Sequence, residues 1–291
     1  MKDLWMNKTT LRFWGVRGSI PSPGPQTAQI GGNTSCLEVL CGKTRLIFDA
    51  GTGIRLLGQK IMAEGGKKTL HLFLSHYHLD HVIGIPFFTP LYQKDVRLNI
   101  YGPKGYVRSV DEILGHLFSS EFFPVPLTDV ASRITYYPVG SDTILVKPFV
   151  VRSFYVNHPG KTLGYVAEIS GKRLAYLPDH ESIHKFCHLS RSLKKFYSSA
   201  LIENLYGADI LVHDAQFTDK DYPTYCGWGH SSWDDALDLA IKAHIKTLVF
   251  FHHAPQNTDV FLKKNFAVFC KKLRSKKIKI ILAHEGMHLS L

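Results

Sequence analysis

The densest group of chemically active side chains in this 291-residue chain comprises three histidines and one aspartate: His76, His78, Asp80 and His81. The group directly follows residues 69–74, an apolar run typical of a buried strand. In an extended segment, residues two apart project to the same side, so His76 and His78 can bind one cation, and a following turn can direct Asp80 and His81 to a second. Imidazole and carboxylate ligands suit zinc, manganese or iron better than magnesium or calcium alone. The segment predicts a transition-metal centre, with a chance histidine-rich strand end as the alternative interpretation.

The H-x-H-x-D-H pattern resembles that of the metallo-β-lactamase superfamily, as does the F-D-A-G-T-G segment at residues 48–53 that precedes it. Three later segments stand, in order, where that family has its third histidine, its bridging aspartate and its final histidine: N-H-P-G at 157–160, L-P-D-H at 177–180 and F-F-H-H at 250–253. The resemblance spans roughly residues 11–290. It implies an α/β fold, the αββα four-layer sandwich, in which helices cover the outer faces of two mixed β-sheets.

By the same resemblance the centre would hold two divalent metal ions, zinc or manganese, with iron as a further candidate. One ion would be held by His76, His78 and His158 and the other by Asp80, His81 and His252, with Asp179 between them. Two cations about 3.5–4 Å apart repel each other, and a shared carboxylate neutralises and spaces them. Taken alone, His158 would fit a turn histidine before Pro-Gly equally well.

Two assignments in this set stay open at the level of sequence. Only one member of the His252-His253 doublet can face the metals, because neighbouring side chains at a strand end point in opposite directions. The family register favours His252, and His253 is the alternative. Asp49 is expected to support a ligand histidine rather than bind metal itself. A cap for a helix over residues 53–62 is its alternative role.

Two further segments resemble the tRNase Z branch of the superfamily, whose members cut phosphodiesters. L-V-H-D-A-Q-F at 211–217 is similar to its His-Glu-Ala-Thr motif, and G-W-G-H-S at 227–231 is similar to its Gly-His-Ser motif. These motifs imply that His230 protonates the leaving oxygen and that Asp214 orients His230. Asp214 replaces a glutamate and therefore reaches less far. A strand-end cap for Asp214 and a turn role for His230 are the alternatives.

The chemistry implied by the resemblance is attack on phosphorus by a metal-bound hydroxide, with Asp80 assisting the loss of its proton. His230 as imidazolium would complete the displacement. A ribose alkoxide leaves poorly, so a positioned acid is worth roughly 10²–10⁴ in rate.

The interval between His158 and Asp179 bears on the substrate, because tRNase Z carries its RNA-gripping arm there. A hairpin already expected in this interval leaves no room for such an arm, which favours a small phosphodiester such as a cyclic nucleotide over RNA. G-V-R-G-S at 15–19 and G-G-N-T-S at 31–35 also resemble the cyclic-nucleotide phosphodiesterase-like members. Arg17 and Asn33 could contact substrate, or these glycine-rich segments could simply form turns.

Three other functions remain as alternatives. An RNA-processing endonuclease of the tRNase Z type shares the full motif set. A glyoxalase-type thioesterase or lactonase shares the metal ligands and has no need of His230. A basic nucleic-acid-binding protein with structural metals would bind in a salt-sensitive way.

Strands and helices are expected to alternate along the chain in two passes. The expected strands cover residues 11–15, 34–40, 44–48, 69–74, 96–101, 144–157, 163–177 with a hairpin at 170–172, 209–213, 247–251 and 278–283. The expected helices cover residues 53–62, 110–119, 183–206, 232–243 and 259–272. No low-complexity linker divides these passes, so the pattern predicts one domain, residues 1–291, built of two packed sheets with helices outside.

Composition sets broader limits. The net charge of +11 favours an anionic substrate, although the lysine-rich segment 263–277 also fits a solvated helix face. Five scattered cysteines suggest neither a disulfide framework nor a thiolate zinc site. The chain has no eighteen-residue apolar run and no secretory signal at its start, so we expect a cytoplasmic protein without membrane contact. A homodimer would agree with the tRNase Z resemblance, but no sequence feature requires one.

Overall fold

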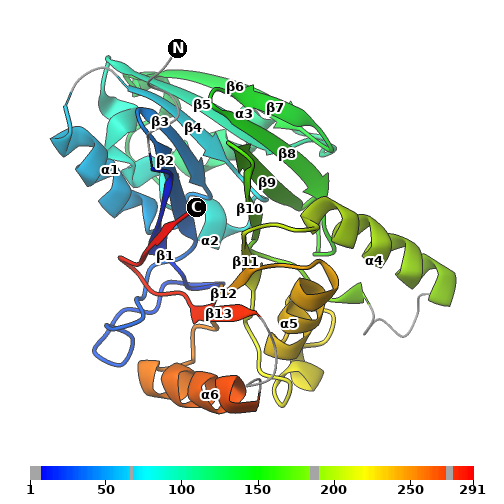
Figure 1. The fold of residues 1–291 in the computed structure, drawn as a ribbon. Helices are drawn as coiled ribbons and strands as arrows, with labels where there is room; N and C mark the ends of the chain where they lie inside the picture. The colour runs from blue at the N-terminus through cyan, green and yellow to red at the C-terminus, as the bar shows by residue number, and fades with distance from the viewer. Residues whose placement is uncertain (1–7, 66–67, 184–189, 273–277) are drawn as a thin grey trace.

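The computed structural model describes residues 8–65, 68–183, 190–272 and 278–291. Within them, two seven-stranded sheets form the centre of the molecule (Figure 1). The first has the order β14-β1-β2-β3-β4-β5-β6: β14 (His288–Ser290), β1 (Thr10–Gly15), β2 (Cys36–Cys41), β3 (Thr44–Phe48), β4 (Lys68–Phe73), β5 (Val96–Pro103) and β6 (Arg133–Val139). The second has the order β13-β12-β11-β10-β9-β8-β7: β13 (Lys279–Leu282), β12 (Thr247–Phe251), β11 (Ile210–Asp214), β10 (Lys172–Leu177), β9 (Leu163–Ile169), β8 (Phe149–Tyr155) and β7 (Thr143–Val146).

Both sheets are mixed, as expected. In the first, β14, β1, β2 and β3 pair antiparallel, and β3 to β6 pair parallel. In the second, β7 to β10 pair antiparallel, and β10 to β13 pair parallel. Parallel strands end at the same edge of a sheet, so the segments that follow β10, β11 and β12 emerge side by side.

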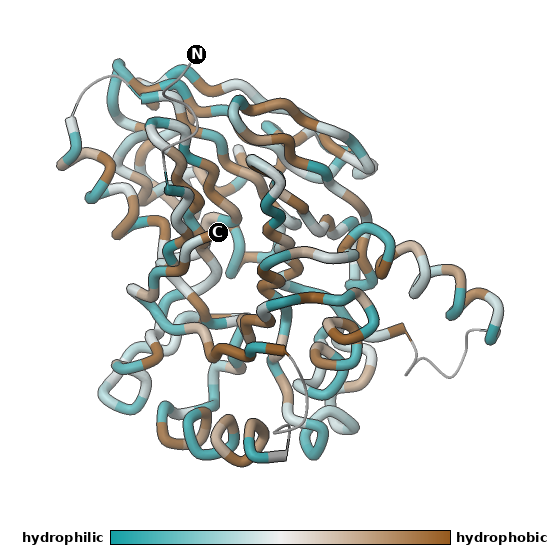
Figure 2. Tube along the Cα trace, in the orientation of Figure 1, coloured by the Kyte–Doolittle hydropathy of each residue, from teal (hydrophilic) through white to brown (hydrophobic). Residues whose placement is uncertain are grey.

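Aromatic and aliphatic side chains from both sheets form the core between them. The Phe48 ring lies 5.4 Å from that of Phe73 in the first sheet, and 5.6 Å and 5.3 Å from those of Tyr165 and Tyr176 in the second, measured between centroids. All four side chains are buried. Apolar segments accordingly run through the centre of the fold in Figure 2, with hydrophilic ones at its margins.

Helices cover the outer faces. On the first sheet lie α1 (Ile54–Ala63) and α3 (Val110–Gly115), and on the second α5 (Trp233–Lys242) and α6 (Asp259–Lys272). The Trp233 ring of α5 packs 5.3 Å from Phe250 of β12, and Phe269 of α6 contacts both. The α4 helix (Arg191–Leu205) extends away from the sheets on the right of Figure 1. This arrangement confirms the predicted αββα sandwich.

Most predicted elements are present with shifted ends. The hairpin expected at 170–172 is a two-residue turn in which Ser170 and Gly171 both have positive φ, the conformation that type I′ turns require. The helix expected over 110–119 ends at Gly115 and continues as a short 3₁₀ turn. The helix expected over 183–206 begins only at Arg191, and residues 184–189, including Cys187, lie outside the described part.

Apart from the short 3₁₀ turns, three elements were not predicted: β6, β14 and α2. Strand β14 has only three residues, too few for an alternating pattern, and forms by pairing with β1. The one-turn helix α2 (Leu79–Val82) lies inside the metal-ligand motif. None of the described helices is both long and apolar enough to cross a lipid bilayer.

Candidate metal centre

The motif at 75–81 changes conformation midway, which separates its four candidate ligands into two pairs. His78 has extended backbone angles, φ −62° and ψ 149°, and α2 begins at the next residue. His76 and His78 therefore project together from the extended part, with ring centroids 4.4 Å apart. Asp80 and His81 project from the helical turn. This is the local geometry that the spacing predicts.

Segments distant in sequence complete two groups of potential ligand atoms. In one, the ligand atoms of His76, His78, His158 and Asp179 all lie within 4.8 Å of one another. In the other, those of Asp80, His81 and His252 meet the same limit. The structure thus brings together all seven side chains that the sequence singled out, in the two predicted sets.

Asp179 stands between the two groups, with one carboxylate oxygen toward each. Its Oδ2 lies 3.6 Å from Nε2 of His76 and 3.6 Å from Nε2 of His158. Its Oδ1 lies 3.1 Å from Nε2 of His81 and 3.3 Å from Nε2 of His252. A carboxylate in this position has the geometry needed to link two cations.

Buried polar atoms at the centre of the cluster fit a metal. His76 Nε2 and Asp179 Oδ1 are both buried, and neither forms a hydrogen bond, which would be costly unless a cation took them as ligands. Burial alone raises the pKa of Asp179, but His252, His81 and His76 outweigh it, and the pKa lies well below its usual range. An ionised carboxylate among imidazoles is the ligand set of a divalent transition metal.

Asp49 supports the second group from behind. Its Oδ2 lies 2.8 Å from Nδ1 of His81 and accepts a hydrogen bond from the Tyr176 hydroxyl, and its Oδ1 accepts one from the Ser75 backbone N–H. This contact fixes which His81 nitrogen faces the centre. The alternative role as a helix cap is wrong, because Gly53 caps α1 without a side-chain hydrogen bond.

The structure decides between the two adjacent histidines at the end of β12. His252 directs Nε2 into the cluster, 3.1 Å from Asp80 Oδ2, whereas His253 turns away and its Nε2 lies 2.9 Å from the Ala283 carbonyl oxygen. Burial, together with the charge of Arg17, lowers the pKa of His253 to about 3, although its hydrogen bond to Ala283 opposes the shift. His253 is therefore neutral and outside the candidate centre.

His230 and Asp214 form a buried pair beside the cluster. His230 Nδ1 lies 2.8 Å from Asp214 Oδ2, which leaves Nε2 as the free ring nitrogen. The ring stacks at 5.0 Å on that of His252. Burial lowers the pKa of His230, but Asp214, Asp179 and Asp80 outweigh burial and raise the pKa to about 9. Despite its shorter side chain, Asp214 reaches the histidine.

Two groups in the N-terminal glycine-rich loop also shape the centre, and the sequence analysis missed both. The backbone N–H of Ser19 donates to Asp80 Oδ2 at 2.7 Å. A Cβ atom on Gly18 would lie 2.3 Å from the His252 ring, so only glycine leaves room for that histidine. The G-x-R-G-S pattern carried the signal, but nothing in the sequence says which side chain packs over it.

Arg17 and Asn33 hold the loops together and do not face the candidate centre. Arg17 is completely buried, and its guanidinium donates to the carbonyls of Gly31 at 2.7 Å and Asn257 at 2.6 Å. Asn33 donates its side-chain N–H to Glu285 at 2.9 Å. Of the two roles left open by the sequence, these contacts support the structural one, because the loop folds inward against the segment after β12.

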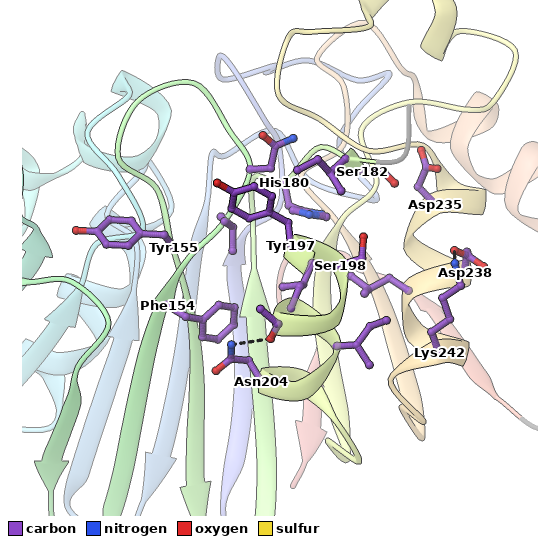
Figure 3. A pocket seen from close by; sticks show the side chains of 17 residues that line it. Phe154, Tyr155, His180, Ser182, Tyr197, Ser198, Asn204, Asp235, Asp238 and Lys242 are labelled. Atoms are coloured by element: carbon purple, nitrogen blue, oxygen red, sulfur yellow. Dashed lines mark hydrogen bonds and ion pairs between the residues drawn. The ribbon is translucent and has the colours of Figure 1, made fainter. Parts of the chain in front are cut away.

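Two cavities have walls formed in part by candidate metal ligands or by residues next to them in the chain. One, of about 570 Å³, is bordered by His78 and by Pro159, the residue after His158. The other, of about 370 Å³, lies between the end of β8, α4 and α5, where Phe154, Tyr197 and Asp238 point into it (Figure 3). None of the seven predicted ligands lines this second cavity.

A two-sheet sandwich with a histidine and aspartate cluster at its strand ends defines the class of metal-dependent hydrolases with the metallo-β-lactamase fold. The family model described as a β-lactamase superfamily domain matches residues 44–253. The chain belongs to this superfamily and is a hydrolase.

The chain is similar in sequence to known ribonucleases and similar in fold to several solved structures. The Ribonuclease Z of Nanoarchaeum equitans is 24% identical over 277 residues, covering 83% of this chain and 82% of the relative. The crystal structure of human tRNase Z, short form, has a TM-score of 0.65 at 17% identity, covering 97% of this chain and 98% of that one. The crystal structure of unliganded yeast PDE1 has a TM-score of 0.68 at 14% identity, covering 98% and 100%.

Proposed function

We propose that the protein is a metal-dependent phosphodiesterase that acts on a small nucleotide phosphodiester, such as a cyclic nucleotide. The observation that carries the proposal is the His230–Asp214 pair, 2.8 Å apart and adjacent to the candidate metal centre. Hydrolysis of a thioester releases a thiolate, which leaves without such an acid, whereas the alkoxide that leaves from a ribose needs one.

In this proposal the seven clustered side chains hold two divalent ions, zinc or manganese. When bound, such ions supply Lewis-acid activation of water and neutralise charge on the phosphate oxygens. Asp179 spaces the two sets, and Asp80, fixed by the Ser19 N–H, accepts the proton of the attacking water. His230 gives a proton from Nε2 to the leaving oxygen, and Asp214 holds the ring in the orientation for this transfer.

The preference for a small substrate rests on the segment between His158 and Asp179. The described structure accounts for this whole segment: β9 and β10 occupy residues 163–169 and 172–177, and both strands are paired within the sheet. No residues are left there for an arm that could hold the body of an RNA.

A second candidate is an RNA-processing endonuclease, because sequence relatives covering more than four-fifths of this chain carry the name Ribonuclease Z. The net charge of +11 also suits RNA. This endonuclease would use every catalytic residue proposed for the phosphodiesterase, so only the substrate distinguishes the two candidates.

The test is to incubate purified protein with zinc or manganese and a panel of substrates: 3′,5′-cyclic mononucleotides, bis(p-nitrophenyl) phosphate, a precursor tRNA, a thioester and a β-lactam. We expect turnover of the two small phosphodiesters, abolished in Asp179→Ala and retained in His288→Ala, a change of an exposed histidine outside the cluster. Cleavage of the precursor tRNA alone would favour the second candidate. Cleavage of only the thioester or lactam would refute both.

A further inference from the structure

The cavity of about 570 Å³ opens beside the first ligand group. Its walls come from the 77–78 segment, the loop after β5, α3 and the turn after His158: Tyr77, His78, Tyr106, Val107, Arg108, Ile113, Pro159 and Gly160. A volume of this size lies within the roughly 300–1,000 Å³ range of small-molecule sites. Because His78 is both a wall residue and a candidate ligand, a molecule that reaches the metals can extend into this cavity.

Tyr106 presents a preformed aromatic surface there. Its hydroxyl oxygen accepts a hydrogen bond from the Lys161 backbone N–H at 2.8 Å. Its ring contacts that of Tyr77 edge-on, at 5.5 Å and 66°, and the Tyr77 hydroxyl donates to the Pro103 carbonyl at 3.0 Å. Tyr106 nevertheless remains 40% exposed. A ring held at both ends but open on its surface loses little entropy when a flat ligand stacks on it.

The charge around this aromatic surface is positive. Arg108 lines the cavity and is exposed, and its Nη1 lies 2.7 Å from Nε2 of His116. Lys161 is also exposed and follows the wall residue Gly160. The eight wall residues include no carboxylate. The combination of an aromatic ring and a guanidinium suits a flat ring system that carries hydrogen-bond acceptors and is attached to an anion.

We propose that this cavity binds the nucleoside part of a nucleotide whose phosphate lies at the metal centre. The base stacks on Tyr106, and the Arg108 guanidinium donates to acceptors on the base or to the ribose hydroxyls. The inference rests on the proposed phosphodiesterase function and deepens it, because it makes the nucleoside, rather than the phosphodiester alone, the recognised part of the substrate.

The experiment is calorimetric titration of metal-loaded protein with adenosine 5′-monophosphate and with ribose 5-phosphate, which carries the same phosphate and sugar without the base. Stacking of one base on an aromatic side chain contributes roughly 1–3 kcal/mol, so we expect adenosine 5′-monophosphate to bind about tenfold more tightly. Tyr106→Ala should abolish this advantage and leave the affinity for ribose 5-phosphate unchanged. Tyr106→Phe should retain it.

Tyr206→Ala is the matched control, because Tyr206 is 55% exposed and does not line the cavity. Circular dichroism would check that each variant is folded. Equal affinities for the two ligands in wild type, or an advantage that survives in Tyr106→Ala, would overturn the inference. Failure of the phosphodiesterase proposal would give a different result. The protein would still bind nucleotide in a Tyr106-dependent way but would not hydrolyse the p-nitrophenyl ester of thymidine 5′-phosphate.

Discussion

His230 is the residue whose role is easiest to isolate, because the need for an acid depends on the leaving group. We predict that His230→Ala lowers kcat for a cyclic mononucleotide by roughly 10²–10⁴ and lowers kcat for bis(p-nitrophenyl) phosphate much less. The physical reason is that p-nitrophenolate leaves without protonation and a ribose alkoxide does not. Steady-state kinetics on the two substrates measures the contrast, and Asp214→Asn should show the same pattern with a smaller loss.

The contrast also separates the acid role from a metal-ligand role. His230, Asp179 and His252 offer ligand atoms within 4.8 Å of one another. If His230 bound a metal, its removal would reduce turnover of both substrates alike and lower the metal content. Equal losses on the two substrates would therefore refute the acid role.

Gly18 affects the second ligand group sterically, because the absence of a side chain leaves room for the His252 ring. We predict that Gly18→Ala displaces His252, because the new Cβ atom would lie 2.3 Å from its ring. Elemental analysis should find close to two metal ions per wild-type chain and about one in the variant.

The control is Gly115→Ala, since a Cβ atom there meets nothing within 4 Å and the residue ends α3. It should keep the full metal content. An unchanged metal content in Gly18→Ala would show that His252 is not required to hold the second ion.

At the scale of elements, the ends of strands place the chemistry. His252 follows β12 with a φ of 59°, and Asp49 follows β3 with the same φ. These are left-handed conformations that non-glycine residues rarely adopt. Packing of the loop 15–19 over the end of β12, including the hydrogen bond from Gly18 N–H to the His253 carbonyl, holds this strained end in place.

The neutral His253 at this strand end gives a prediction about pH. Its pKa of about 3, set by burial, lies below the value of about 6.5 for an unfolded histidine. As the pH falls, the unfolded chain therefore protonates His253 before the folded chain does. The stabilisation of the folded state by neutral His253 is complete above pH 6.5 and is lost as the pH falls toward 3.

We predict that wild type loses about 1.4 kcal/mol of stability per pH unit below 6.5 through this one residue. His253→Gln should lack that component. Urea unfolding at pH 7.5 and 5.5, with chelator present so that metal release does not contribute, measures it as the difference between the two proteins. Identical pH dependence would mean that His253 is protonated in the folded state.

At the scale of the whole molecule, the two sheets contribute different halves of the candidate centre. His76, His78, Asp80 and His81 follow β4 of the first sheet, whereas His158, Asp179, Asp214 and His252 follow or end strands of the second. Bound metal would therefore cross-link the sheets, and the apo protein must keep unpaired ligand atoms buried between them.

We predict that removing metal with a chelator lowers Tm and that adding back zinc or manganese restores it. A ligand at 100 times its Kd stabilises the folded state by about 2.7 kcal/mol, a shift that differential scanning calorimetry resolves. Asp179→Ala should melt at the same temperature with and without chelator. A wild-type Tm that does not respond to chelator, with turnover also unaffected, would contradict the two-metal proposal.

The sequence by itself determined the sandwich, the hairpin between β9 and β10 and the change from an extended segment to a turn within the 75–81 motif. These features depend on local hydrophobic period, on turn residues and on ligand spacing, all of which are properties of neighbours along the chain. The order of the later motifs also predicted that His158, Asp179 and one histidine of the pair at 252–253 belong to the candidate centre.

The tertiary structure alone decided the choice of His252 over His253, the structural role of Arg17, the contacts of Gly18 and Ser19 with the candidate centre and the cavity beside His78. In each case the outcome depends on which surface of one loop packs against another loop far away in the sequence. Arg17 shows the reason: its guanidinium is buried because carbonyls from residues 31, 254 and 257 surround it. No spacing within residues 15–19 encodes where those carbonyls lie.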